Sequence, residues 1–128
     1  MTKILPVAKA LYLCDYQFAG VNGKSDLYGI FHGLRPKAYP HTQPRFCVFA
    51  QLASGLGELP FFIEIVGPDE RLVYSSTTRK FRFPNRETVI QLTFEIKGCR
   101  FPVPGMYIVG LYCDNAWIAD TQLHLIEA

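Results

Sequence analysis

A chain of 128 residues with 49% hydrophobic content is long enough to bury a core without metals or disulfides. The net charge of +2 is too small to indicate nucleic-acid binding by itself. Only 19% of the residues are charged, against a usual value of about 25%, and 14% are aromatic, so we expect some apolar or aromatic surface outside the core.

The N-terminal segment and the cysteines indicate a cytoplasmic protein. Lys9 interrupts the first apolar run, so a signal peptide is not expected, and no stretch approaches the ~18 apolar residues of a membrane span. Cys14, Cys47, Cys99 and Cys113 are widely spaced and form no Cys-x-x-Cys pair. We expect them to be free, buried thiols, whereas a secreted protein would favour a disulfide between two of them.

Alternation of apolar and polar residues predicts β-strands throughout the chain and no helix of ordinary length. Proline residues predict a loop over Pro36–Pro44, and Thr77–Arg86 has a less regular pattern. In chain order, the expected strands are Val7 to Cys14 or Phe18, Asp26–Arg35, Arg45–Ala53, Pro60–Val66, Arg71–Ser76, Thr88–Ile96 and two more within Pro102–Ile126.

Three turn sequences separate these strands. Asn22-Gly23 is typical of positive φ, Gly67-Pro-Asp-Glu70 predicts a hairpin, and Asp114-Asn-Ala116 reverses the last pair of strands. Seven or eight short strands with turns at this spacing favour an all-β, single-domain antiparallel β-sandwich of the Ig-like kind over residues 1–128. The first strand is apolar on both faces, which indicates cover on both sides or a nearby interface.

Several blocks of sequence together resemble an uncharacterised family of small bacterial β-sandwich proteins. They are Leu11–Asp15, Leu27–Phe31, Phe46–Ala50, Gly67–Asp69 and Pro104–Tyr107 with Asp114. The resemblance spans nearly the whole chain. It implies an Ig-like fold and a bacterial cytosolic setting, and it brings no activity, catalytic residue or ligand residue with it.

No constellation of catalytic or metal-binding residues is visible in the sequence. His32, His41 and His124 lack the short spacing of metal ligands, and no Gly-x-Ser-x-Gly motif or phosphate-binding loop is present. We therefore expect no catalytic residues, no metal, no cofactor and no enzymatic activity. An unrecognised enzyme would need a site that is assembled only in three dimensions.

One basic cluster could bind a partner. In Arg79-Lys-Phe-Arg-Phe-Pro-Asn-Arg86, the residues Arg79, Lys80, Arg82 and Arg86 alternate with aromatic side chains. The favoured interpretation is a charged edge strand with its phenylalanines in the core. An acidic protein or a membrane surface is a second interpretation, and nucleic acid, which the near-neutral net charge disfavours, is a third.

Two aromatic residues next to loops are further candidates for recognition. Trp117 begins the last strand, where packing within the hairpin is the favoured interpretation, and Tyr39 lies in the Pro-rich loop. The leading hypothesis is a non-enzymatic module that binds another protein or itself, through a strand edge or an aromatic loop end. The alternative is a small-ligand or carbohydrate binder that uses Tyr39 and Trp117.

Overall fold

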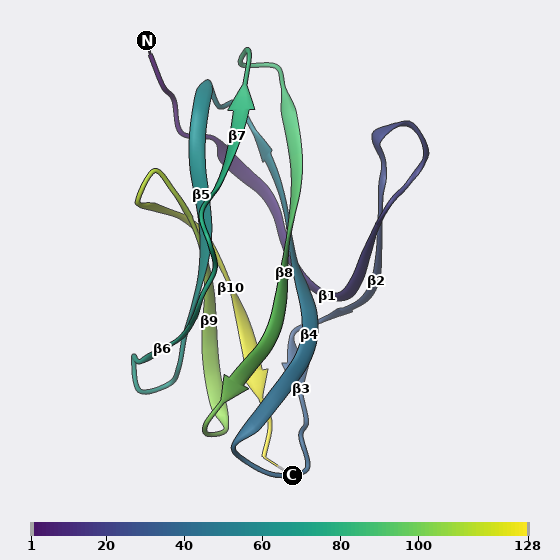
Figure 1. The fold of residues 1–128 in the computed structure, drawn as a ribbon, viewed down its shortest axis with the longest axis vertical. Helices are drawn as coiled ribbons and strands as arrows, with labels where there is room; N and C mark the ends of the chain where they lie inside the picture. Colours follow the sequence, from purple (N-terminus) through teal and green to yellow (C-terminus); the bar gives the residue numbers. More distant parts are fainter. Residues whose placement is uncertain (1, 128) are drawn as a thin grey trace.

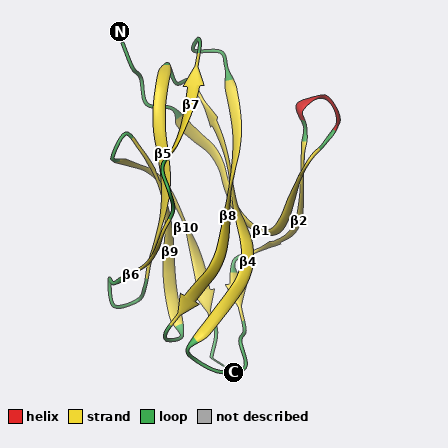
Figure 2. Ribbon diagram, in the orientation of Figure 1, coloured by secondary structure: helices red, strands yellow, loops and turns green. Residues whose placement is uncertain are grey.

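The computed structural model describes residues 2–127, and these form ten strands (Figures 1 and 2). The only helical element among them is a single 3-10 turn at Val21–Gly23, red in Figure 2. The strands are β1 Val7–Ala19, β2 Ser25–Phe31, β3 Gly33–Leu34, β4 His41–Ala53, β5 Gly57–Val66, β6 Leu72–Ser75, β7 Arg79–Phe83, β8 Val89–Phe101, β9 Gly105–Cys113 and β10 Ala116–Leu125.

The strands form two sheets. One has the order β2-β1-β4-β8, and the other has the order β3-β10-β9-β5-β6, with β7 also paired to β5. Every strand pair is antiparallel except β3 with β10, which is parallel, so the expectation of a purely antiparallel fold is corrected at this one place. The all-β class is confirmed.

The predicted count of seven or eight strands was too low for two physical reasons. The segment Asp26–Arg35 is not one strand, because the chain breaks at His32 and crosses from the first sheet to the second. The segment Thr77–Arg86 contains β7, which is short but pairs with β5 from Arg79 to Phe83. These two changes account for the ten strands.

The predicted loop Pro36–Pro44 was also too long, because β4 begins at His41 and includes Pro44. The ladder between β1 and β4 ends where Cys14 faces Cys47. Residues 41–46 are therefore paired with β8 alone. Proline is tolerated in such an edge segment, because its missing N–H can point away from the ladder.

The core lies between the two sheets. Alternate residues of β5, including Phe61, Ile63 and Ile65, are fully buried against inward-facing residues of β4, β8 and β9. No polar or charged residue within 2–127 is buried. The β9–β10 hairpin closes through Asp114 and Asn115, whose φ values of 50° and 65° fit a two-residue turn of type I′.

The β1–β2 hairpin projects from the body, and we call residues 15–31 the arm (Figure 1). All five residues Phe46–Ala50 of β4 are buried, although only alternate ones can face the core. The outward-facing Cys47 and Phe49 must therefore be covered from the other side. The Cys47 thiol lies 4.0 Å from the Asp15 carbonyl oxygen, and Ser25 Oγ donates to Gln91 Oε1 of β8 at 2.6 Å, so the arm folds back over the sheet.

Candidate interaction surfaces

The basic cluster lies on an exposed edge of the second sheet. Arg79, Lys80 and Arg82 are exposed on β7, while Phe83 is buried and Phe81 is half-buried against the core. Arg86 follows in a loop, where its Nε donates to the Ser54 carbonyl at 2.9 Å. The pattern of exposed cations and buried rings is that of a charged edge strand.

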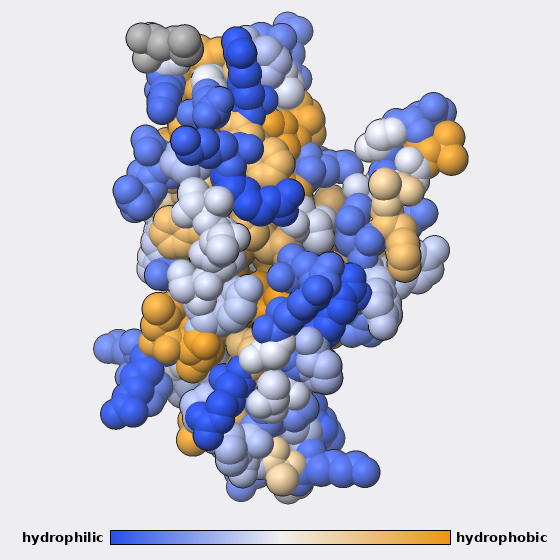
Figure 3. Space-filling view, in the orientation of Figure 1, coloured by the Kyte–Doolittle hydropathy of each residue, from blue (hydrophilic) through white to orange (hydrophobic). Residues whose placement is uncertain are grey.

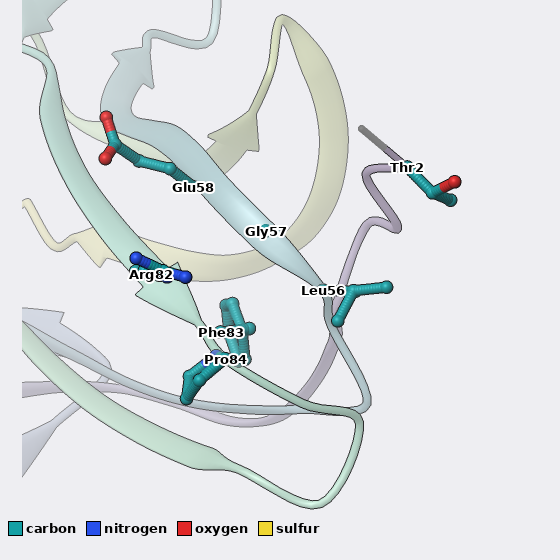
Figure 4. Close-up of a pocket in the computed structure, with 7 residues that line it drawn as sticks. All are labelled: Thr2, Leu56, Gly57, Glu58, Arg82, Phe83 and Pro84. Atoms are coloured by element: carbon teal, nitrogen blue, oxygen red, sulfur yellow. The ribbon is translucent and has the colours of Figure 1, made fainter.

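Of the other basic side chains, Arg79 forms a hydrogen bond and Arg82 has an acidic residue as its neighbour in the ladder. The Arg79 guanidinium donates to the Thr93 carbonyl oxygen and lies 5.0 Å from the centre of the Phe81 ring. Arg82 faces Glu58 across the β5–β7 ladder. Arg82 and Glu58 line a hollow of about 330 Å³, together with Phe83 and Pro84 (Figure 4). Because a cation and an anion lie side by side there, the hollow offers no concentrated positive charge for phosphates.

Tyr39 lies at the opposite end of the molecule from the basic cluster. Its hydroxyl donates to the Ile126 carbonyl at 2.8 Å, and its ring is half-buried against the core. Burial raises the pKa of this phenol, with smaller contributions from Tyr107 and Glu127. The side chain thus ties the loop after β3 to the C-terminal segment.

Trp117 ends a row of aromatic rings on the outer face of the second sheet. Phe62, Tyr112 and Trp117 face one another across β5, β9 and β10. The Phe62 and Tyr112 rings stack with centres 4.9 Å apart, and the Tyr112 and Trp117 rings stack at 6.2 Å. Trp117 packs within its hairpin, as the favoured interpretation had it, yet it is 58% exposed because no strand lies beyond it in the row.

A groove of about 350 Å³ lies beside this aromatic row. Trp117 and Tyr112 border one end, Val66 and Ile108 contribute apolar surface, and Glu64 contributes a carboxylate. Gly110 keeps the groove open, since a Cβ there would lie 3.2 Å from Tyr112 and 3.6 Å from Trp117. Burial raises the pKa of Tyr112, and the charge and hydrogen bond of Glu64 add to that shift.

One face of the arm carries an aromatic cluster that was not predicted from the sequence. Tyr16 faces Tyr28 across the two strands, and Phe18 meets the Tyr28 ring edge-to-face at 5.5 Å. Ile30 lies on the same face, opposite Cys14. Tyr16, Phe18, Tyr28 and Ile30 are each between 51% and 57% exposed, and we call them the arm cluster. In Figure 3 the arm shows blue, pale, tan and orange atoms side by side.

The sequence held a signal for this cluster. Both faces of the first strand are apolar, and the alternation continues through Tyr16 and Phe18 to the Asn22-Gly23 turn. In the register, Tyr16 and Phe18 share a face of β1 with Cys14, which lies opposite Cys47 of β4, and they become exposed where the arm leaves the ladder with β4. What the pattern could not show is the backward fold of the arm, which depends on contacts such as Ser25 with Gln91.

The named candidate residues do not converge on one site. The basic cluster, Tyr39, Trp117 and the arm cluster lie on separate parts of the surface. Within residues 2–127, no group of three His, Cys, Asp or Glu side chains is placed to hold a metal ion. All four cysteines are buried, as predicted, and their sulfurs are not bonded to one another. No helix in this part of the chain is long and apolar enough to cross a membrane.

Comparison with known proteins assigns the chain to a family. Residues 9–126 match the model of DUF6941, a family of unknown function, and the chain belongs to that family. This confirms the resemblance to an uncharacterised family. No curated protein matches the sequence.

One of several solved structures with partial similarity is a DNA-bound enzyme. It is the alkylpurine DNA glycosylase AlkC of Pseudomonas fluorescens, bound to DNA containing an abasic site analog. The match has 11% identity and a TM-score of 0.48, and it covers 74% of this chain and 27% of the glycosylase chain. Similarity at this level supports no inference about DNA binding or base excision here.

Proposed function

We propose that this protein is a non-enzymatic interaction module that binds another protein, or a second copy of itself, through the arm cluster. The observation that carries the proposal is the exposure of Tyr16, Phe18, Tyr28 and Ile30 on one face of a projecting hairpin. Aromatic side chains supply large contact area with few rotatable bonds, and they are enriched at the centres of protein interfaces.

The way in which the arm is attached to the sheet also makes it suitable for recognition of a partner. Arg45 stacks over Tyr16 at 4.7 Å and forms an ion pair with Glu95, which holds the base of the arm in place. Ser25 fixes the far end through Gln91. A surface held at both ends loses less conformational entropy on binding than a free loop does.

Site-specific photo-crosslinking tests this proposal. A photoreactive phenylalanine at position 18 should give discrete adducts in the native cell, and the same group at Val103, which is exposed outside the arm, should not. Light scattering over a concentration series would separate self-association from a foreign partner. A monomer at all concentrations with identical adduct patterns at both positions would overturn the proposal.

A second candidate function is small-ligand binding at the groove beside Trp117. The exposed indole at the end of the aromatic row favours it. Tyr39, the other residue of the carbohydrate hypothesis, is outside the lining of this groove and is engaged with Ile126. Fluorescence of Trp117, the one tryptophan of the chain, reports ligand entry directly, so a panel of neutral glycans tests this candidate.

The type of β-sandwich and the cellular location are also proposed. We propose that the two sheets form an Ig-like sandwich and that the module works in the bacterial cytoplasm. The resemblance of the sequence blocks supports both statements. Four thiols that are not bonded to one another fit a reducing compartment.

A further inference from the structure

The groove beside Trp117 has a distinctive combination of charge and aromatic surface. Two carboxylates, those of Glu64 on β5 and Glu70 in the β5–β6 turn, line it, and no Lys, Arg or His does among residues 2–127. The whole chain carries a net charge of +2, so this acidic patch is local and runs against the overall balance. Charge complementarity therefore favours a cationic ligand.

The hydrogen-bonding capacity of the groove points the same way. The Trp117 indole N–H is already donated to the Ala119 carbonyl at 3.0 Å. The charge of Glu64 helps to raise the pKa of the Tyr112 phenol, and both residues line the groove. Besides the Tyr112 hydroxyl, the polar side chains that remain are the two carboxylates, which only accept hydrogen bonds. A sugar hydroxyl both donates and accepts, whereas an ammonium or guanidinium group only donates, so the cation matches this lining better.

The aromatic and apolar surfaces complete the match. A cation is attracted to the face of an indole or phenol ring, most strongly to that of tryptophan. The side chains of Val66, Ile108 and Met106 offer surface for a short aliphatic stem. The volume of about 350 Å³ is at the small end of ligand sites, which suits a head group with a few carbons.

The geometry points to the groove as a binding site for an organic cation, an ammonium or guanidinium group on a short aliphatic stem. This inference rests on the second candidate function, and it is independent of protein binding by the arm. The cation can come from a free amine or from a lysine or arginine side chain of a partner, and both sources share the chemistry that the groove recognises.

Titration of Trp117 fluorescence tests the inference on the intact protein. The free-cation probes are n-butylammonium and n-butylguanidinium, the peptide probes are end-capped tripeptides with a central lysine or arginine, and the neutral control is n-butanol. We expect saturable changes with the cations, weakening as salt is raised, and none with n-butanol. Comparison of the free and peptide probes identifies the source.

Substitutions assign the effect to the groove. Glu64→Gln and Glu70→Gln should each weaken cation binding by about three- to tenfold, while Glu58→Gln, elsewhere on the same sheet, should leave it unchanged. The salt dependence and the n-butanol control do not require any variant to fold. Equal responses to n-butylammonium and n-butanol would overturn the inference. Responses to neutral glycans alone would overturn it while leaving ligand binding intact, and no response to any probe would remove both.

Discussion

The guanidinium carbon of Arg45 lies 4.7 Å from the centre of the Tyr16 ring. Because Arg45 belongs to β4 and Tyr16 to the arm, this contact joins a projecting hairpin to the body of the protein. The same arginine is hydrogen-bonded to Glu95 of β8. One side chain thus links the arm to two strands of the sheet that the arm covers.

Removal of this link should loosen the arm without unfolding the core. In Arg45→Ala we expect amide hydrogens of residues 15–31 to exchange about three- to tenfold faster, since the cation–π contact and the ion pair are both lost. Hydrogen-exchange mass spectrometry measures this. Arg100→Ala, a change at an exposed arginine of β8, is the control and should leave exchange in the arm unchanged. Equal acceleration throughout the molecule would contradict this role for Arg45.

The ion pair also predicts how stability depends on acid. Hydrogen bonds from Arg45 and then Lys97 lower the pKa of Glu95 from its usual 4.5 to about 2. Between these values the unfolded chain binds the proton and the folded protein does not, so stability is full above about 4.5 and falls as the pH approaches 2. We expect Glu95→Gln to flatten this part of the curve of unfolding midpoint against pH, with Glu87→Gln as the control. An unchanged slope would show that the pair is not held in solution.

The reactivity of the cysteines provides a second test of how the arm is held against the sheet. Burial raises the pKa of Cys14 to about 11 and the pKa values of Cys99 and Cys113 to about 12, so all three thiols are protonated at pH 8 and should react slowly with iodoacetamide. In Arg45→Ala we expect faster labelling of Cys14 and Cys47 alone, because they lie under the arm. Mass spectrometry of the labelled peptides distinguishes this result from acceleration at all four sites, which would indicate global unfolding instead.

Substitution of two glycines allows the cost of backbone strain alone to be compared with the cost of strain together with a steric clash. Gly105 has φ 136°, and a Cβ there would lie 2.6 Å from Pro68 Cγ, whereas Gly98 has φ 63° and open space around it. Gly105→Ala should therefore cost about 2–4 kcal/mol of unfolding free energy, against about 1 kcal/mol for Gly98→Ala. Urea denaturation of both variants measures the difference. Similar losses would mean that the Pro68 turn moves aside at little cost.

Local patterns predicted most strands, because alternation and turn residues are properties of neighbours in sequence. The β5 core face of Phe61, Ile63 and Ile65 and the Asp114-Asn115 turn are examples. The break at His32 was missed, and the charged edge strand expected around Arg79–Phe83 was left out of the strand count, since both depend on which strand lies alongside.

The interaction surfaces were harder to predict than the strands, because they depend on which segments lie side by side in the fold. Trp117 was singled out by type and by its place next to a turn, and the structure places it at a groove. The sequence indicated Glu70 only as a turn residue and did not indicate that it and Glu64 lie near the indole, because separate strands and turns bring these residues together. Prediction of the arm cluster required knowing where β1 leaves its ladder with β4, which the alternation of residues does not show.

The pairing of β3 with β10 sets the order in which the molecule can be completed. Residues 33 and 34 lie beside residues 124 and 125, and Tyr39 is bonded to Ile126. During synthesis the segment after the arm therefore lacks these partners until residues 124–126 emerge. Pairings so distant in sequence are slow to form, and the nascent chain exposes unpaired edges while it waits. A ribosome that stalls before residues 124–126 have emerged would leave an intermediate prone to aggregation.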